Sequence, residues 1–112
     1  MKLAVVGNRK GYTKKYVYKE LDTYNLTDED FIITGGAKGV DTFAMQYAKE
    51  RGISLIVYYA SLIIPIPDRY FSRNFKIAFN CDEMLAFNKK VHSGTTNSIN
   101  HALHLNKMVK IK

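Results

Sequence analysis

The chain has 112 residues, a length that predicts one domain with a single hydrophobic core over residues 1–112. Its 46% hydrophobic and 24% charged residues are typical of a globular protein and exclude wholesale disorder, and no apolar run approaches the ~20 residues of a membrane span. Seventeen lysines and arginines against ten acidic residues give a net charge of +7, which favours anionic partners, although a lysine-rich solvated surface would carry the same charge.

Short apolar runs alternate with segments of helical periodicity along the whole chain. The expected elements, in chain order, are a strand at Lys2–Val6, a helix at Thr13–Tyr24, a strand at Phe31–Thr34, a helix at Thr42–Arg51, a strand at Ile53–Tyr59, a helix at Arg69–Asn80, a strand at Met84–Phe87, a helix at Thr96–Leu105 and an edge strand at Lys107–Ile111. Gly52 is expected to stop the second helix, and two prolines, Pro65 and Pro67, to exclude regular structure before the third.

This alternation of strands and helices predicts an α/β fold, a Rossmann-like doubly wound parallel sheet with helices on both faces. The strands are apolar almost throughout, as expected for strands buried on both faces. In such a fold, ligands bind beyond the carboxyl ends of the strands, where the strand order reverses. The residues that directly follow each strand are therefore the candidates for function.

The loop Gly35–Asp41 (GGAKGVD) gives the sharpest functional signal. Its three glycines allow close approach of backbone to a ligand, the following helix N-terminus favours an anion, and Lys38 adds a cation. Asp41 has two interpretations, as the N-cap of the helix, which we favour, or as an acceptor for a ribose hydroxyl. The spacing matches neither the G-x-G-x-x-G fingerprint nor the P-loop.

Two further loops carry residues that suit phosphate. Arg9 follows the first strand and is a bidentate donor for phosphate or carboxylate, unless this loop is only a surface turn. Ser93-Gly94-Thr95-Thr96 precedes the fourth helix, where it forms an anion pocket unless Ser93 or Thr95 merely caps the helix. The candidate ligand-binding residues are Gly7, Asn8, Arg9, Gly35, Gly36, Ala37, Lys38, Gly39, Asp41, Arg73, Asn74, Asn88, Ser93, Gly94, Thr95 and Thr96.

Four motifs, in this order, make the sequence resemble the SLOG nucleotide-binding superfamily, which includes the Smf/DprA DNA-processing proteins and the Lonely Guy phosphoribohydrolases. They are Gly7-Asn8-Arg9, the Gly35–Asp41 loop, Arg73-Asn74 and Ser93-Gly94-Thr95, and the small stand-alone YspA-like members are the most similar. The resemblance implies a strand order of 3-2-1-4-5. It also implies a nucleotide-derived ligand whose phosphates lie against Gly35-Gly36 and Gly94-Thr95, with Arg9 and Arg73 as anion partners.

The sequence departs from the Lonely Guy pattern after Gly94-Thr95, where Thr96, Asn97 and Ser98 stand in place of catalytic glutamates. Three functions follow as alternatives: binding of a nucleotide-derived ligand by a sensor or sequestering protein, N-glycosidic cleavage of a nucleoside monophosphate, and binding of single-stranded nucleic acid. If the protein is an enzyme, Asp41 and Arg73 are the catalytic candidates.

Few other residues suggest chemistry. His101 and His104 have a spacing that can hold a metal but lack a third ligand, and one cysteine, Cys81, excludes a cysteine cluster and a disulfide and favours a reducing, cytoplasmic setting. We expect neither a metal nor a cofactor, and no membrane partner. His92 is a candidate ligand contact. Three tyrosines are candidates for base stacking, although ordinary packing is the simpler interpretation: Tyr58, Tyr59 and Tyr70. The apolar stretch Ser61–Pro67 either folds over the sheet edge or makes a homo-oligomer contact.

Overall fold

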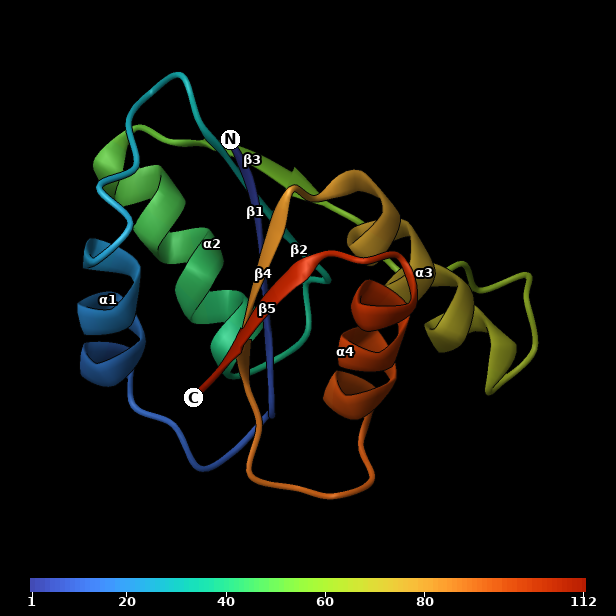
Figure 1. Ribbon diagram of the computed structural model, residues 1–112. Helices are drawn as coiled ribbons and strands as arrows, with labels where there is room; N and C mark the ends of the chain where they lie inside the picture. The colour runs from blue at the N-terminus through green and yellow to red at the C-terminus, as the bar shows by residue number, and fades with distance from the viewer.

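Five parallel strands form one sheet in the order β3-β2-β1-β4-β5, and helices cover both of its faces (Figure 1). The structure is a computed structural model that describes all residues from Met1 to Lys112. Its elements are β1 (Lys2–Gly7), α1 (Lys14–Asp22), β2 (Phe31–Thr34), α2 (Val40–Arg51), β3 (Ser54–Val57), α3 (Asp68–Asn80), β4 (Glu83–Phe87), α4 (Gly94–His104) and β5 (Met108–Ile111). The predicted Rossmann-like fold and strand order are confirmed.

Strand alternation builds a separate core on each face of the sheet. Leu3 and Val5 of β1 point into the core that α1 and α2 cover, whereas Ala4 and Val6 point into the core beneath α3 and α4. Successive side chains of a strand face opposite sides, so one short strand supplies both cores. This arrangement leaves the ends of the strands as the place where polar side chains can gather.

Helix boundaries follow from local capping. The hydroxyl of Thr13 accepts a hydrogen bond from the Tyr16 amide and starts α1, and Gly52 in the left-handed region ends α2, as predicted. The second and fourth helices each begin two residues earlier than the apolar periodicity indicates. Gly39 turns the chain into α2 at Val40, and the Ser93 hydroxyl caps α4 by accepting from the Thr96 amide at 3.1 Å.

Strand register brings the loops after β1 and β4 together. Gly7 at the end of β1 lies opposite Phe87 at the end of β4, so that Asn8 and Asn88 follow at the same level. Because β2 and β4 flank β1, the strand order reverses at this point, and the loops after all three strands share one edge of the sheet. None of the four helices combines the length and apolar character needed to cross a bilayer.

Candidate functional site

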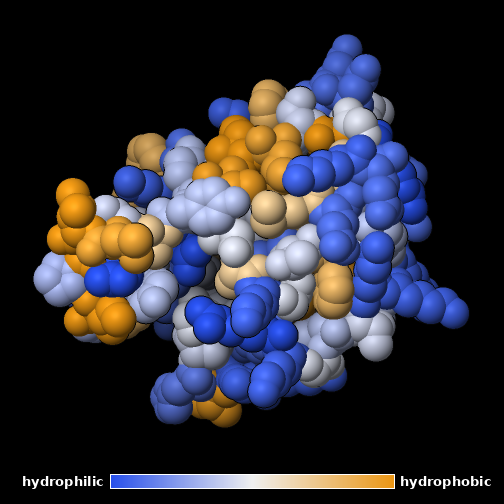
Figure 2. Space-filling model, turned by 180° about the vertical axis from the view of Figure 1, so that it is seen from behind, coloured by the Kyte–Doolittle hydropathy of each residue, from blue (hydrophilic) through white to orange (hydrophobic).

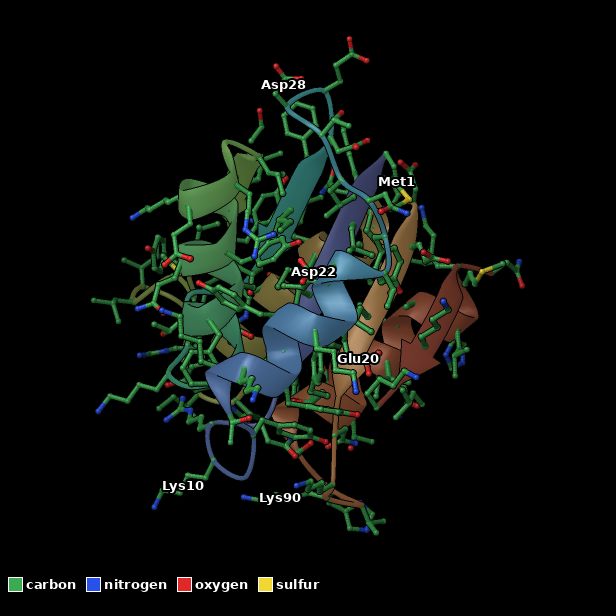
Figure 3. All side chains as sticks on the ribbon, turned by 90° about the vertical axis from the view of Figure 1, so that its left-hand side faces the viewer. Met1, Lys10, Glu20, Asp22, Asp28 and Lys90 are labelled. Atoms are coloured by element: carbon green, nitrogen blue, oxygen red, sulfur yellow. The ribbon has the colours of Figure 1, made fainter.

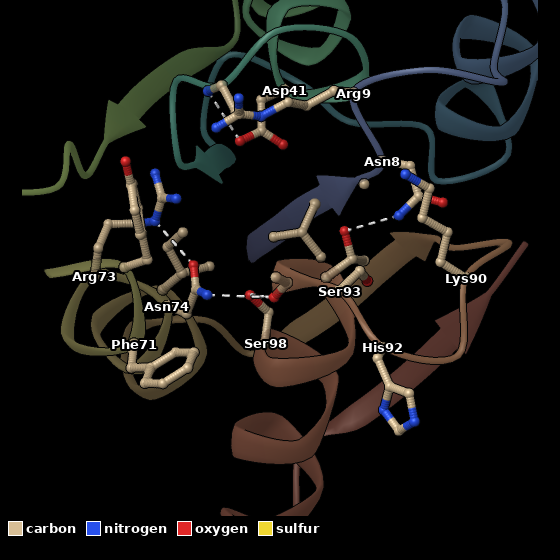
Figure 4. Close-up of a pocket in the computed structure, with 17 residues that line it drawn as sticks. Asn8, Arg9, Asp41, Phe71, Arg73, Asn74, Lys90, His92, Ser93 and Ser98 are labelled. Atoms are coloured by element: carbon tan, nitrogen blue, oxygen red, sulfur yellow. Dashed lines mark hydrogen bonds between the residues drawn. The ribbon is translucent and has the colours of Figure 1, made fainter. Parts of the chain in front are cut away.

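A cavity of about 450 Å³ opens at the carboxyl ends of the strands, beside α3 and the start of α4 (Figure 4). Ten of the candidate ligand-binding residues line it: Gly7, Asn8, Arg9, Ala37, Asp41, Arg73, Asn74, Ser93, Gly94 and Thr95. They come from all three predicted loops and from α3. The remaining candidates lie outside its wall: Gly35, Gly36, Lys38, Gly39, Asn88 and Thr96.

Asn8 is the centre of the hydrogen bonds that join two of these loops. Its amide nitrogen donates to Asn88 Oδ1 at 2.9 Å and to Thr95 Oγ1 at 3.3 Å, and its amide oxygen accepts from the Lys89 backbone at 2.8 Å. The side chain is 5% exposed, so these bonds are made away from water. Asn8 therefore fixes the β1 loop against the β4 loop and the start of α4.

Asn88 and Thr96 shape the site from behind its wall. Asn88 Oδ1 also accepts from the Ser93 hydroxyl at 3.2 Å, and its Nδ2 donates to Thr96 Oγ1 at 3.2 Å. The Thr96 hydroxyl in turn contacts the backbone oxygen of Val91 at 3.1 Å. Both side chains hold the loop from 88 to 93 in place, and neither lines the cavity.

Arg73 is anchored at two points on the cavity wall. Its Nη1 donates to the Gly35 backbone oxygen at 2.5 Å, and its Nε donates to Asn74 Oδ1 at 2.8 Å. The buried Asn74 amide donates in turn to the Gly94 oxygen and to Asn97 Oδ1, which ties α3 to the start of α4. Partial burial lowers the pKa of Arg73, and a neighbouring Arg9 acts in the same direction.

Asp41 is a buried carboxylate beside these arginines. The favoured interpretation of Asp41 as the N-cap of α2 is wrong, because the helix begins at Val40 and Asp41 already lies in its first turn. The carboxylate instead reaches back to accept from the Ala37 amide at 3.2 Å. Burial raises the pKa of Asp41 to about 6, although the Ala37 amide and the Arg73 charge favour the ionised form.

All three glycines of the Gly35–Asp41 loop lie against other parts of the protein. A Cβ on Gly35 would lie 2.6 Å from Arg73 Nη1, one on Gly36 would overlap the ring of Tyr59, and one on Gly39 would overlap the Arg9 carbonyl oxygen. Gly35 and Gly36 thus lie beneath side chains instead of on the cavity wall. The expected phosphate contact at Gly35-Gly36 stays a prediction.

Substitution of Gly39 by alanine is expected to lower the free energy of unfolding more than substitution of Gly52. Both glycines have positive φ, +78° and +67°, and the left-handed conformation of Gly52 costs alanine roughly 1–2 kcal/mol. Gly39, with a ψ of −124°, lies outside the left-handed region and is no more favourable for alanine. Only at Gly39 does the added methyl group also meet backbone, so we expect a further ~1–3 kcal/mol there. Urea unfolding of the two variants tests this comparison, and equal losses of stability would contradict it.

The structure adds seven residues to the cavity wall: Val6, Tyr70, Phe71, Ile77, Lys90, His92 and Ser98. Tyr70 and His92 were considered for ligand contact from the sequence, and both lie here. Tyr70 and Ile77 lie three or four positions from Arg73 and Asn74, on the same face of α3. The helical spacing around the Arg-Asn pair therefore predicts their place on the cavity wall. The sequence does not predict Lys90 on the wall, because its position depends on how the loop after β4 folds.

The remaining tyrosine and histidine candidates lie away from the cavity. Tyr58 packs against the core beneath α3 and α4, and Tyr59 covers Gly36. His101 packs edge-on against Phe75 with ring centroids 5.5 Å apart, while His104 Nδ1 contacts its own helix. No three histidine, cysteine or carboxylate side chains are grouped as metal ligands.

Comparison with known proteins agrees with this fold. The structure of DNA processing protein A (DprA) from Streptococcus pneumoniae aligns with a TM-score of 0.83 and 23% identity over 98% of this chain, which spans 49% of that protein. DprA from Helicobacter pylori aligns with a TM-score of 0.75 and 20% identity, over 99% of this chain and 64% of that one. That structure is described by its unique single-stranded DNA binding mode. The structure of the protein TM1055 aligns with a TM-score of 0.71 and 19% identity, over 96% of this chain and 71% of that one. These identities establish the shared fold alone.

Family membership comes from the sequence itself. No curated protein matches it. Residues 1–62, more than half of the 112, match the family described as YspA, cpYpsA-related SLOG. This segment contains the Gly7-Asn8-Arg9 turn and the Gly35–Asp41 loop, two of the four motifs that carry the resemblance. The chain belongs to the YspA, cpYpsA-related SLOG family.

Proposed function

We propose that the cavity binds a nucleotide or nucleotide-derived ligand through its phosphate, and that residues 1–112 act as one ligand-binding unit that senses or sequesters this molecule. The observation that carries the proposal is the charge of the cavity wall. Arg9, Arg73 and Lys90 line the cavity together with one carboxylate, Asp41, so basic side chains outnumber acidic ones by three to one. A cavity of about 450 Å³ is of the size that small-molecule ligands occupy.

The groups around the cavity suit the parts of a nucleotide. Arg9 is exposed and free to turn towards a phosphate, whereas Arg73 is already anchored and would share its charge between Asp41 and the ligand. The start of α4 at Gly94 adds the positive end of a helix dipole. Tyr70 offers a ring for a base. The single-stranded DNA binding described for DprA from Helicobacter pylori supports a nucleotide ligand for this fold.

Substitution of Arg9 by alanine is expected to weaken nucleotide binding by about tenfold or more, the effect of losing one charge-assisted hydrogen bond to phosphate. Because Arg9 is exposed, its loss should leave the free energy of unfolding within about 0.5 kcal/mol of the wild type. Isothermal titration against nucleoside monophosphates, diphosphates, ADP-ribose and cyclic nucleotides measures the affinities.

Lys49→Ala is the matched control, since it removes one exposed positive charge from α2, away from the cavity wall. Equal weakening by both variants would show a general effect of net charge and would contradict the assignment of Arg9. Absence of binding below the millimolar range for every compound would overturn the proposed function. Release of free base during the titration would identify N-glycosidic cleavage in place of simple binding.

We also propose that the segment between β3 and α3 makes a contact between copies of this chain. Three of its apolar side chains are largely exposed: Leu62 by 82%, Ile63 by 93% and Ile66 by 65%. Figure 2 shows hydrophobic side chains gathered on the projecting part of the molecule at the left of the view, where this segment lies. Analytical ultracentrifugation tests the proposal, and a monomer at all concentrations would overturn it.

A further inference from the structure

A second cavity, of about 420 Å³, lies between the start of α1 and the ends of β4 and β5. Its wall consists of Gly11, Tyr12, Thr13, Tyr16, Lys89 and Lys112. None of these residues belongs to the first cavity. Two tyrosines and two lysines therefore surround a space that lies outside the proposed nucleotide site.

The two tyrosine rings form a fixed platform. The rings of Tyr12 and Tyr16 are nearly parallel, with an interplanar angle of 21° and centroids 6.1 Å apart, and both pack nearly perpendicular to the buried Phe87 ring. Tyr16 remains 37% exposed. An exposed aromatic ring that is held from below offers a face on which a base can stack without first being ordered.

A lysine is held directly beside this platform. Lys89 Nζ lies 4.6 Å from the centroid of the Tyr12 ring and donates to the Gly11 backbone oxygen at 2.7 Å. The ammonium group is thus positioned near the rings, where it can pair with a phosphate attached to a stacked base. Lys112 adds a second cation, which lies 3.6 Å from the Glu20 carboxylate.

The loops after β1 and β4 separate the second cavity from the first, the arginine-lined cavity that contains Arg9 and Arg73. Lys89 lines the second cavity and Lys90 the first, and Arg9 of the first cavity is two residues from Gly11 of the second. The loops, residues 8–13 and 88–93, contain no acidic residue. In Figure 3, Lys10 and Lys90 project from the same end of the molecule. A polyanion that passes from one cavity to the other along these loops therefore meets basic side chains and no carboxylate.

We propose that the second cavity receives a base and its phosphate from a single-stranded nucleotide chain whose neighbouring phosphate occupies the first cavity. The inference rests on the proposed function and makes it more specific, because it predicts a ligand of at least two linked nucleotides. A basic path that follows the backbone, with aromatic rings for the bases, is the usual way in which proteins bind such chains without reading sequence.

The test compares thymidine 5′-monophosphate, the dinucleotide pTpT and an oligothymidylate of roughly twelve nucleotides, a length within the range that single-stranded binding sites cover. We expect Tyr16→Leu to weaken binding of the dinucleotide and the oligomer by about tenfold, the effect of one lost base stack, and to leave binding of the monophosphate unchanged. Tyr16→Phe retains the ring and should bind like the wild type. Phe79→Leu, which removes another exposed ring on the opposite helical layer, is the matched control.

A second measurement uses another variant, so its outcome does not depend on whether Tyr16→Leu folds correctly. Lys89→Gln should reduce the slope of log affinity against log salt concentration by about one for the oligomer and leave the slope for the monophosphate unchanged. Monophosphate binding without tighter binding of the longer ligands, or equal losses in Tyr16→Leu and Phe79→Leu, would overturn this inference and leave the proposed function intact. Failure of all three ligands to bind would also overturn this inference, whereas the proposed function fails only if every compound of the wider nucleotide panel fails to bind.

Discussion

Replacing Asn8 with alanine is expected to lower the free energy of unfolding by about 2–4 kcal/mol, because the substitution removes three hydrogen bonds from a buried position. The Lys89 backbone amide would lose its acceptor, and Asn88 Oδ1 and Thr95 Oγ1 would lose a donor. Buried polar groups left without partners cost more than the bonds themselves contribute. Urea unfolding measures the change.

The variant should lose ligand affinity as well, since Asn8 joins the β1 loop to the loop before α4. Asn100→Ala is the control, because Asn100 is exposed on α4 and alanine is a better helix former there. We expect its stability to stay within about 0.5 kcal/mol of the wild type. An Asn8→Ala variant as stable as this control would show that the hydrogen bonds around Asn8 do not hold the site together.

Raising the pH from 4 to 7 is expected to destabilise the wild-type protein relative to Asp41→Asn by about 3 kcal/mol. Burial raises the pKa of Asp41 from 3.8 to about 6, so the folded protein binds this proton more tightly than the unfolded chain does. The stability that the bound proton contributes is complete below pH 4, falls as the pH rises through 6 and is lost above it. A difference of about two pKa units corresponds to the stated free energy.

Asp41→Asn removes the titration and keeps an oxygen that can accept from the Ala37 amide. The comparison between variants is needed because Asp22 and Asp30 act in the opposite direction. Hydrogen bonds from Tyr47 to Asp22 and from the N-terminal ammonium group to Asp30 lower the pKa of each, so both lose stabilising charge as the pH falls. Parallel stability curves for the wild type and Asp41→Asn between pH 4 and 7 would contradict the burial of an unfavourable charge at this position.

The sheet and the meeting of three loops could be predicted from the sequence, because strand alternation and the rule of right-handed crossovers leave few arrangements. Apolar runs such as Phe31–Thr34 mark the strands, and the polar residues that follow each strand must then lie on one edge. The predicted starts of α2 and α4 were less accurate, each two residues later than in the structure. They depend on the backbone of Gly39 and on the Ser93 side chain, which periodicity does not record.

The role of each glycine and of Asp41 could not be predicted, because it depends on contacts between distant parts of the chain. Gly35 lies beneath Arg73, which is 38 residues away, whereas Ala37 of the same loop lines the cavity. Asp41 faces Ala37 because the helix begins one residue before it. The Tyr12 and Tyr16 platform depends in the same way on Phe87 at the end of β4.

The most direct test of the nucleotide site is a titration of the ¹⁵N-labelled protein with a nucleoside monophosphate, followed by two-dimensional NMR. We predict that the backbone amides whose resonances shift are those around the arginine-lined cavity, at Arg9, Arg73 and Gly94, together with the side-chain amide of Asn74. Unchanged resonances up to millimolar nucleotide, or shifts confined to the far ends of the strands near Lys2 and Glu83, would contradict the proposal.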